Sequence, residues 1–407
     1  MEEWKEYKET EFGKIPNSWD VATIKEETKV VVDYVANGSF ASLAENVKYK
    51  TEEDYAVLIR LVDYKNNYNG NFVFIDKEAY EFLGKSKLFG DEIIISNVGA
   101  NVGTVFKCPR LKYKMSLAPN SIMVKFKGNN DFYYYWLKSP FGQHMLHSIV
   151  TGSAQPKFNK TNFREMSIPV PPIEIQEKIA QLLKPLDEKI EVNKQINSNL
   201  EEQAKALYSK YASLAIGTAR IGDLANEVLD YTPCTYPRVY LLNSSDISEG
   251  IFPKIELVDN KDLKGHFKKR FRFGDILYSQ IRPRNHHYGL VLFEADRYIS
   301  STRLMIIRTK KEQISEYLLY QAIISPCVCD EFTLKTETRS GTFPQGNYKD
   351  MANIIIPYGT KEQREKIEPK LKVLREAIYS YQKENVILSS IRDALLPKLM
   401  SGEIEVK

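Results

Sequence analysis

The chain has 407 residues, of which 43% are hydrophobic and 27% are charged, and its formal net charge is +4 at pH 7. At about 150 residues per domain this length predicts two or three domains, and the composition excludes wholesale disorder. No apolar run approaches the roughly 18 residues of a membrane helix, so a membrane-spanning protein is not expected.

The N-terminus, MEEWKEYKETE, is acidic and polar, so we expect no secretory signal and no transit peptide. The four cysteines, at 108, 234, 327 and 329, are too few for a disulfide scaffold and contain no C-x-x-C pair. This usage predicts a cytoplasmic protein without a structural zinc site.

The first part of the chain reads as an α+β domain, which we place at residues 1–170. Short β-branched or aromatic runs at 89–95 and 120–126 predict strands, and residues 131–146 show a helical pattern. After the proline-rich run 169–172, apolar residues at spacings of three and four predict an amphipathic helix, which we place at 171–213. Pro185 lies inside this pattern, and because proline lacks the N–H we expect the helix to break there.

The second half of the chain repeats the first. Phe-Gly-Asp at 89–91 returns at 273–275, and Ile-Pro at 168–169 returns at 356–357. We therefore predict a second α+β domain at 214–357, with strands at 276–278, 289–293 and 303–308. A second helical region follows at 358–407, with Pro369 inside it.

Two long amphipathic helices need partners for their apolar stripes, and we expect them to pair as an antiparallel coiled coil. The polar positions Asn193, Gln203 and Glu384 either fix the register of this pair or are tolerated edge positions. The predicted seam consists of Leu186, Ile196, Leu200, Leu374, Leu388 and Ile391.

Positive charge is concentrated in two windows. Residues 93–130 contain no acid, and residues 264–288 contain one, Asp275. The run 279–288 mixes arginines with amides and histidines, and the loops 151–160 and 339–347 occupy matching places in the repeats. Lys and Arg bind phosphates, Arg also reads guanine, and Asn or Gln reads adenine. These segments are either solubilising loops or a DNA-binding surface, and the concentration of charge favours DNA.

The candidate DNA-binding residues in the first half are Lys107, Arg110, Lys112, Lys114, Lys125, Lys157, Asn159 and Lys160. Those in the second half are Lys268, Lys269, Arg270, Arg272, Gln280, Arg282, Arg284, Asn285, His286, His287, Arg339, Gln345 and Asn347.

No motif predicts catalysis: the chain contains no G-x-x-x-x-G-K-[ST], H-E-x-x-H or G-x-S-x-G. We therefore expect a binding protein with no catalytic residue and no metal ligand. Two other classes are alternatives. A coiled-coil adaptor without nucleic acid would explain the helices but not the basic windows, and a single-chain DNA nuclease would need clustered acids for a metal.

Several short motifs, in order along the chain, resemble the DNA-specificity subunits of type I restriction–modification systems. They are Gly-Lys-Ile-Pro-Asn-Ser-Trp at 13–19, the Gly-Asp strands at 90–94 and 274–277, Gly-Ser-x-Gln-Pro at 152–156, Ile-Pro-Val-Pro-Pro at 168–172 followed by Gln-Glu-Lys-Ile at 176–179, and the tail at 395–404. The resemblance covers essentially the whole chain. The second repeat departs from it in the loop 340–345 and at Gly359-Thr360.

The resemblance implies two target-recognition domains, each reading one half of a split double-stranded DNA target. The two helices would separate these domains and dock two DNA-methyltransferase (modification) subunits. It further implies that this chain binds no cofactor. S-adenosylmethionine, ATP and Mg would belong to partner subunits that methylate adenine and, where a restriction subunit joins, translocate and cleave DNA.

Overall fold

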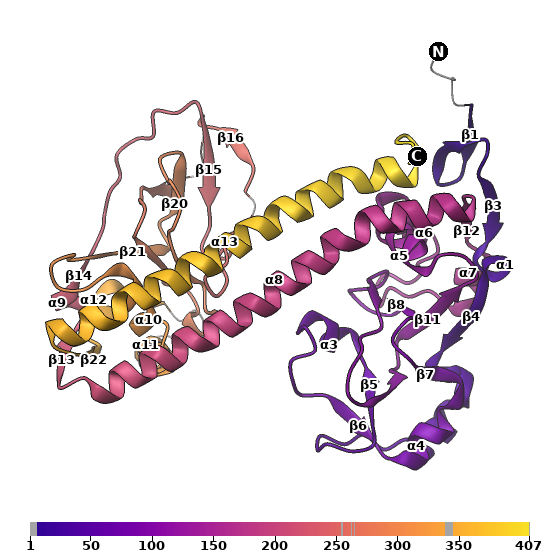
Figure 1. Cartoon of the computed structure of the whole chain (residues 1–407), viewed down its shortest axis with the longest axis horizontal. Coiled ribbons are helices and arrows are strands. Elements are labelled where there is room, and N and C mark those ends of the chain that lie inside the picture. Colours follow the sequence, from indigo (N-terminus) through magenta and orange to yellow (C-terminus); the bar gives the residue numbers. More distant parts are fainter. Residues whose placement is uncertain (1–5, 254, 262, 264, 338–344, 407) are drawn as a thin grey trace. The chain divides into compact units, whose positions relative to one another are not determined.

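The computed structural model describes residues 6–253, 255–261, 263, 265–337 and 345–406. The chain divides into two compact units, one formed by residues 1–188 with 388–407 and the other by residues 189–387. Each unit contains one α+β domain and the ends of two long helices, α8 (Ile173–Leu214) and α13 (Lys361–Met400) (Figure 1). No helix in these described residues combines the length and apolar character that crossing a membrane requires.

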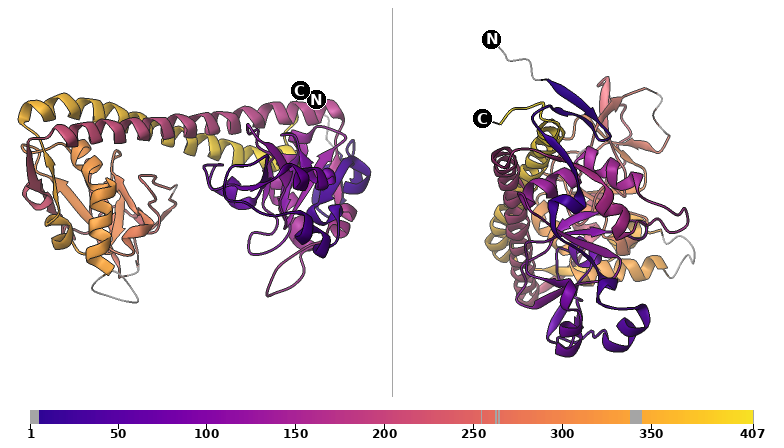
Figure 2. Two further views of the ribbon diagram at one scale, coloured as in Figure 1. Left: turned by 90° about the horizontal axis from the view of Figure 1, so that it is seen from below. Right: turned by 90° about the vertical axis from the view of Figure 1, so that its right-hand side faces the viewer.

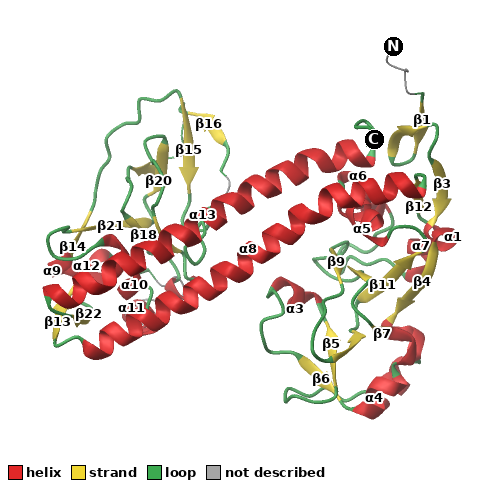
Figure 3. Cartoon of the chain, viewed as in Figure 1, coloured by secondary structure: helices red, strands yellow, loops and turns green. Residues whose placement is uncertain are grey.

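Two four-stranded sheets build the first domain (Figure 3). One is antiparallel throughout, in the order β4-β11-β8-β9, and the other has the order β6-β5-β10-β7 with a parallel pair, β5 and β10. Along β8, Ile93 and Ile95 face a core shared with the helices, whereas Ile94 faces the second sheet, as the two-residue period of a strand requires. The strands are β4 (Thr28–Asp33), β5 (Ala56–Ile59), β6 (Val73–Ile75), β7 (Lys87–Leu88), β8 (Ile93–Ser96), β9 (Val105–Lys107), β10 (Lys114–Leu117) and β11 (Ser121–Phe126).

Helices and two short strand pairs complete the first domain. The hairpin β1 (Tyr7–Thr10)–β2 (Gly13–Pro16) begins the chain, and β3 (Asp20–Thr23) pairs with β12 (Ser167–Val170). In α5 (Asn130–Lys138) all residues from Phe132 to Leu137 are buried, and three of them are among the 25 tyrosines of the chain. The other helices are α1 (Ile24–Glu27), α2 (Phe40–Asn46), α3 (Leu61–Lys65), α4 (Lys77–Phe82), α6 (Pro140–Ser148) and α7 (Lys160–Glu165).

The second domain repeats this topology, which confirms the predicted duplication. Its sheets have the orders β14-β21-β18-β19 and β16-β15-β20-β17, and again one pair, β15 and β20, is parallel. The strands are β13 (Gly217–Arg220), β14 (Ala225–Glu227), β15 (Arg238–Leu242), β16 (Leu257–Asp259), β17 (Phe267–Lys269), β18 (Ile276–Ser279), β19 (Tyr288–Leu290), β20 (Tyr298–Ser301), β21 (Leu304–Thr309) and β22 (Ile355–Tyr358). The helices are α9 (Ile221–Leu224), α10 (Glu316–Ile323), α11 (Pro326–Glu337) and α12 (Tyr348–Ala352).

The strand registers give the alignment of the two repeats. Val124 pairs with Ile93 in the first domain, and Ile307 pairs with Ile276 in the second. Glu92, which directly precedes β8, is therefore the counterpart of Asp275, which directly precedes β18. The motif comparison, which matched Asp91 with Asp275, is wrong by one residue.

The predicted break at Pro185 is wrong, because α8 is one helix of 42 residues and α13 is likewise continuous through Pro369. Each proline removes one backbone hydrogen bond. On either side of Pro185, Leu183 and Ile190 are 0% and 8% exposed. Packing on both sides of the proline thus keeps the helix whole.

The long helices run antiparallel and lie side by side, as predicted (Figures 1 and 2). Arg392 binds Asp187 at 2.6 Å, Asn193 donates to Glu384 at 2.7 Å, and Arg375 binds Glu201 at 2.5 Å. As residue numbers increase along α8, the residues that they contact on α13 have decreasing numbers, as in an antiparallel pair. Asn193 is fully buried and also donates to Asn385, whereas Gln203 is exposed, so only Asn193 and Glu384 of the three polar positions meet.

The predicted seam is partly displaced. Leu186, Ile196, Leu200, Leu374 and Leu388 are half-buried, but Ile391 is 43% exposed and its assignment to the seam is wrong. The most buried positions are instead residues such as Leu183 and Leu396, in the core of the first domain, and Ala204 and Leu371, in the core of the second. The buried face is broader than a two-helix seam because each helix end also covers a domain.

Residues near the two ends of the described chain meet in the first unit. The Tyr7 hydroxyl donates to the Gly402 carbonyl at 3.2 Å, and Trp19 shares one core with Leu399 and Met400. Gly402 has φ +69°, and a Cβ there would lie 2.4 Å from Pro16. The motif at 13–19 and the tail at 395–404 therefore pack against each other in the first unit.

Candidate nucleic-acid interface

Three loops converge at one end of the antiparallel sheet in the first domain, and we call residues 97–103, 119–120 and 151–160 the first loop cluster. The amide of Asn97 donates to the Asn120 carbonyl at 3.1 Å, and the amide of Phe158 donates to the Asn97 carbonyl at 3.1 Å. Lys157 exchanges two backbone hydrogen bonds with Thr151, at 2.8 and 2.9 Å. These bonds fix the loop that the sequence singled out at 151–160 against the end of β8.

A groove of about 820 Å³ opens between this cluster and α2. Phe40 is 81% exposed and Tyr49 is 56% exposed, so two large aromatic surfaces lie open at the groove. Three candidate DNA-binding residues line this groove. Lys157 and Asn159 are exposed, whereas Lys160 forms an ion pair with Asp33 at 3.0 Å. The groove is lined by Asp33, Tyr34, Val35, Phe40, Leu43, Ala44, Val47, Lys48, Tyr49, Asn97, Val98, Pro119, Asn120, Ser121, Thr151, Lys157, Phe158, Asn159 and Lys160.

The second domain builds the same arrangement, and we call residues 279–288, 302–303 and 345–347 the second loop cluster. The amide of Gln280 donates to the Arg303 carbonyl at 2.9 Å, and the amide of Gly346 donates to the Gln280 carbonyl at 2.8 Å. The bridge between Ile281 and Gln345 matches the bridge between Val98 and Lys157. Asn159 and Asn347 also match, since each caps the helix that follows, α7 or α12. The structure thus brings the predicted run 279–288 next to Gln345 and Asn347.

The polar side chains of the second loop cluster differ in their partners, since some contact a carboxylate or a carbonyl and others are exposed. Arg284 contacts Glu337 with Nε and Nη2, both at 2.7 Å, so a carboxylate neutralises its charge. His286 lies 3.3 Å from Glu249, and His287 is 2.6 Å from the Ile247 carbonyl. Asn285 is exposed in the short turn η3 (Pro283–Asn285). Arg282 and His286 flank that turn with φ of 47° and 53°, a left-handed conformation that costs free energy in residues other than glycine.

Arg303 was missed by the sequence analysis. Its side chain is exposed, and Nη1 donates to Oε1 of Gln345 at 3.0 Å. No carboxylate of the described residues forms an ion pair with it. The signal that could have found Arg303 is the repeat itself, because the strand registers make Arg303 in the second domain equivalent to Asn120 in the first loop cluster.

The predicted lysines of the window 93–130 lie outside the first loop cluster. Lys107 pairs with Asp131 at 2.6 Å and lies over the ring of Tyr134. Lys112 lies 3.5 Å from Glu53, and Arg110 and Lys114 are exposed. The window is basic in sequence, but it does not form one patch with the loop 151–160.

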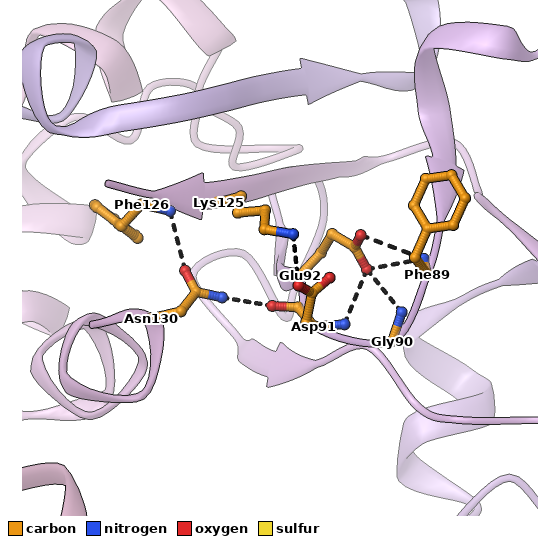
Figure 4. A network of polar contacts seen from close by, with 7 residues as sticks. All are labelled: Phe89, Gly90, Asp91, Glu92, Lys125, Phe126 and Asn130. Atoms are coloured by element: carbon orange, nitrogen blue, oxygen red, sulfur yellow. Dashed lines mark hydrogen bonds and ion pairs between the residues drawn. The ribbon is translucent and has the colours of Figure 1, made fainter. Parts of the chain in front are cut away.

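Lys125 belongs to a network of polar contacts around the turn at 89–92 (Figure 4). The Glu92 carboxylate is buried and accepts hydrogen bonds from the amides of Phe89, Gly90 and Asp91 at 3.0–3.2 Å. Lys125 binds the Asp91 carboxylate instead, and this contact lowers the pKa of Asp91. Lys125 therefore helps to hold the turn in this structure.

The cluster predicted at 268–272 is not a continuous basic surface. Lys269 is 3% exposed and its ammonium group donates to the Leu304 carbonyl at 2.9 Å, so a surface role for Lys269 is wrong. Burial lowers its pKa, and Glu227 only partly opposes that effect. Along a strand neighbouring residues face opposite sides, which is why Lys268 is exposed and Lys269 is not. Arg272 is exposed, Arg270 donates to the Asp296 carbonyl, and Arg339 lies outside the described residues.

Among the described residues no group of three or more His, Cys, Asp and Glu side chains is arranged to hold a metal ion.

A family model described as the type I restriction modification DNA specificity domain matches residues 1–202. The MjaIX specificity subunit of Methanocaldococcus jannaschii, a type I restriction enzyme subunit, is 24% identical over 446 residues, covering 99% of this chain and 97% of that one. Residues 1–202 of this chain therefore match a type I DNA specificity domain, and the chain as a whole is similar to a type I specificity subunit.

Other type I specificity subunits match over different lengths. The HindI specificity subunit of Haemophilus influenzae is 32% identical over 178 residues, which is 43% of this chain and only 38% of that protein. A crystal structure of the S subunit from M. genitalium superposes with a TM-score of 0.58 at 16% identity, covering 94% of this chain and 96% of that one. That likeness supports the fold.

Proposed function

We propose that this chain is the sequence-specific DNA-binding subunit of a type I restriction–modification complex. It recognises a bipartite double-stranded target, with one half-site for each domain, and it positions modification and restriction subunits there. The observation that carries the proposal is the pair of loop clusters. Both rest on the same backbone hydrogen bonds, yet they present different side chains, as two readers of two different half-sites would.

The chain itself is non-catalytic in this proposal. Its partners are DNA, two modification subunits docked along α8 and α13, and restriction subunits in the complete system. The partners bind S-adenosylmethionine, ATP and Mg, and they supply adenine-N6 methylation and type I DNA cleavage. The complex works in the cytoplasm, where its DNA substrate lies.

A reconstitution experiment tests the proposal. The purified chain is mixed with labelled duplexes, with and without the modification subunits of its system, and methyl transfer to adenine is mapped. The proposal predicts site-specific methylation only when both are present. Cleavage by the chain alone with Mg would instead identify a nuclease, and absence of DNA binding in every mixture would identify an adaptor.

A further inference from the structure

The two loop clusters share a pattern of backbone hydrogen bonds, and two equivalent positions in it carry different exposed polar side chains. Asn97 and Gln280 are equivalent, since each receives an amide hydrogen bond from the third loop and donates its own amide to the loop before β11 or β21. In the first cluster, the neighbouring loops place Asn120 and Lys157 beside Asn97. In the second cluster the corresponding residues are Arg303 and Gln345.

All four of these side chains belong to the types that read base edges in the major groove. Arg and Lys donate to guanine, and Asn and Gln pair with adenine. All four residues are exposed, and Asn120 and Lys157 line the 820 Å³ groove. The backbone around them is fixed, so a change of side chain at this pair alters what is read without altering the scaffold.

Arg303 is the best-prepared reader of the four. Its guanidinium group is planar, and one nitrogen is held by Gln345 at 3.0 Å, which restricts the rotation of a long side chain. Arg284, in the same cluster, already binds a carboxylate through two nitrogens. An arginine oriented by a neutral amide keeps its full charge for a guanine O6 and N7, whereas one bound to a carboxylate does not.

We propose that Arg303, positioned by Gln345, reads a guanine in the half-site of the second domain, and that Asn120 and Lys157 occupy the equivalent reading position for the first. The inference rests on the proposed function and names the residues through which it is carried out. It also predicts that the two half-sites differ at the base pairs that lie under these positions.

The test is selection from a pool of randomised duplexes by the full chain with its modification subunits, followed by sequencing. Arg303→Ala should lower the preference for one guanine, in one half-site, by about 5- to 150-fold, the range that corresponds to 1–3 kcal/mol per bidentate contact. Asn120→Ala should change the other half-site only. Arg297→Ala is the matched control, since Arg297 is an exposed arginine of the second domain that lies over Tyr236, outside the second loop cluster, and it should change neither.

Two further variants separate base reading from simple charge. Arg303→Lys keeps a positive charge but loses the planar fork, so it should keep overall affinity and still lose most of the guanine preference. Gln345→Met removes the acceptor that orients Arg303, so it should weaken the same preference by a smaller factor. If Arg303→Lys and Arg303→Ala both keep the full preference while Arg303→Ala lowers overall affinity, Arg303 acts on phosphate and the inference is overturned.

The outcomes for the unmodified chain keep the two proposals apart. If the unmodified complex enriches no sequence, the proposed function fails. If it enriches a bipartite sequence and Arg303→Ala, checked for folding by circular dichroism, enriches the same one, only the inference about Arg303 is rejected.

Discussion

The turns that precede β8 and β18 each contain a buried carboxylate, and the two carboxylates find different polar partners. Glu92 is satisfied by three backbone amides, whereas Asp275, fully buried, accepts from the Arg272 amide and binds Arg308 through two nitrogens at 2.7 and 2.8 Å. In the first repeat the residue equivalent to Arg308 is Lys125, and it binds Asp91 at the surface. The ion pair of the buried Asp275 therefore has a more exposed counterpart, Lys125 with Asp91, in the first repeat.

This difference predicts unequal effects on stability. Asp275→Ala should lower the free energy of unfolding of the second unit by about 2 kcal/mol, because the Arg272 amide loses its buried acceptor and the half-buried Arg308 loses its ion-pair partner. Asp91→Ala should cost less than about 1 kcal/mol, because that ion pair is open to solvent. Hydrogen exchange of β18 and β8 measures the two units separately. Equal losses in both variants would contradict the assignment.

A second prediction at this scale concerns neighbouring lysines. Lys268→Glu should weaken binding to all duplexes and flatten the dependence of log affinity on log salt concentration, because phosphates carry no sequence information. Lys269→Met should leave that slope unchanged, because the ammonium group is buried and bonded to Leu304. Titration of binding at several salt concentrations distinguishes the two. An unchanged slope for Lys268→Glu would remove it from the interface.

At the scale of elements, the helices were predictable but their exposed faces were not. A spacing of three and four indicates a helix, yet Leu182 and Leu183 are both apolar and only the second is buried. The choice depends on what packs against the helix, and a local pattern does not contain that information. The same holds for the basic windows, since charge in sequence does not reveal that Lys269 points into a core or that Lys107 faces Asp131. The repeat, by contrast, could be predicted, because the same short motifs recur in the same order in both halves of the sequence.

The buried polar contact between the long helices gives a prediction for these elements. Asn193 is fully buried and donates to Glu384 and Asn385. Asn193→Asp should destabilise the helix pair by about 3 kcal/mol at neutral pH, because it places an unpaired carboxylate beside Glu384. Acidification should relieve the loss as the carboxylates protonate. Asn199→Asp, on the exposed face of α8, is the control, and thermal unfolding at two pH values measures both. Equal melting temperatures would show that the contact does not fix the register.

At the scale of the whole molecule, the helix pair is expected to set the spacing of the two half-sites. Deleting 194–200 from α8 together with 377–383 from α13 keeps both the Asn193–Glu384 and the Glu201–Arg375 contacts. It removes one heptad from each helix, or about 10 Å at ~1.5 Å per residue, which is roughly 3 base pairs of DNA. The preferred spacer should shorten by that amount, as methylation mapped on duplexes of graded spacer length would show.

Deleting the heptad from α8 alone is the control for this experiment. It puts the two helices out of step and should destabilise the protein rather than shift the spacer. If the matched deletion leaves the preferred spacer unchanged, the helices serve as docking surfaces and do not measure distance.

The meeting of the two chain ends in the first unit has a consequence for synthesis. The ribosome makes the segment up to residue 188 before residues 189–387, but the core that contains Trp19 is completed by Leu396, Leu399 and Met400, which emerge after residue 387. The second unit, 189–387, is continuous in sequence and has all its parts before the tail appears. Contacts between residues so far apart close late in folding, because the intervening loop must lose its entropy first. Of the two domains, the one translated earlier is therefore expected to complete its core later, when the last turns of α13 become available to pack against Trp19.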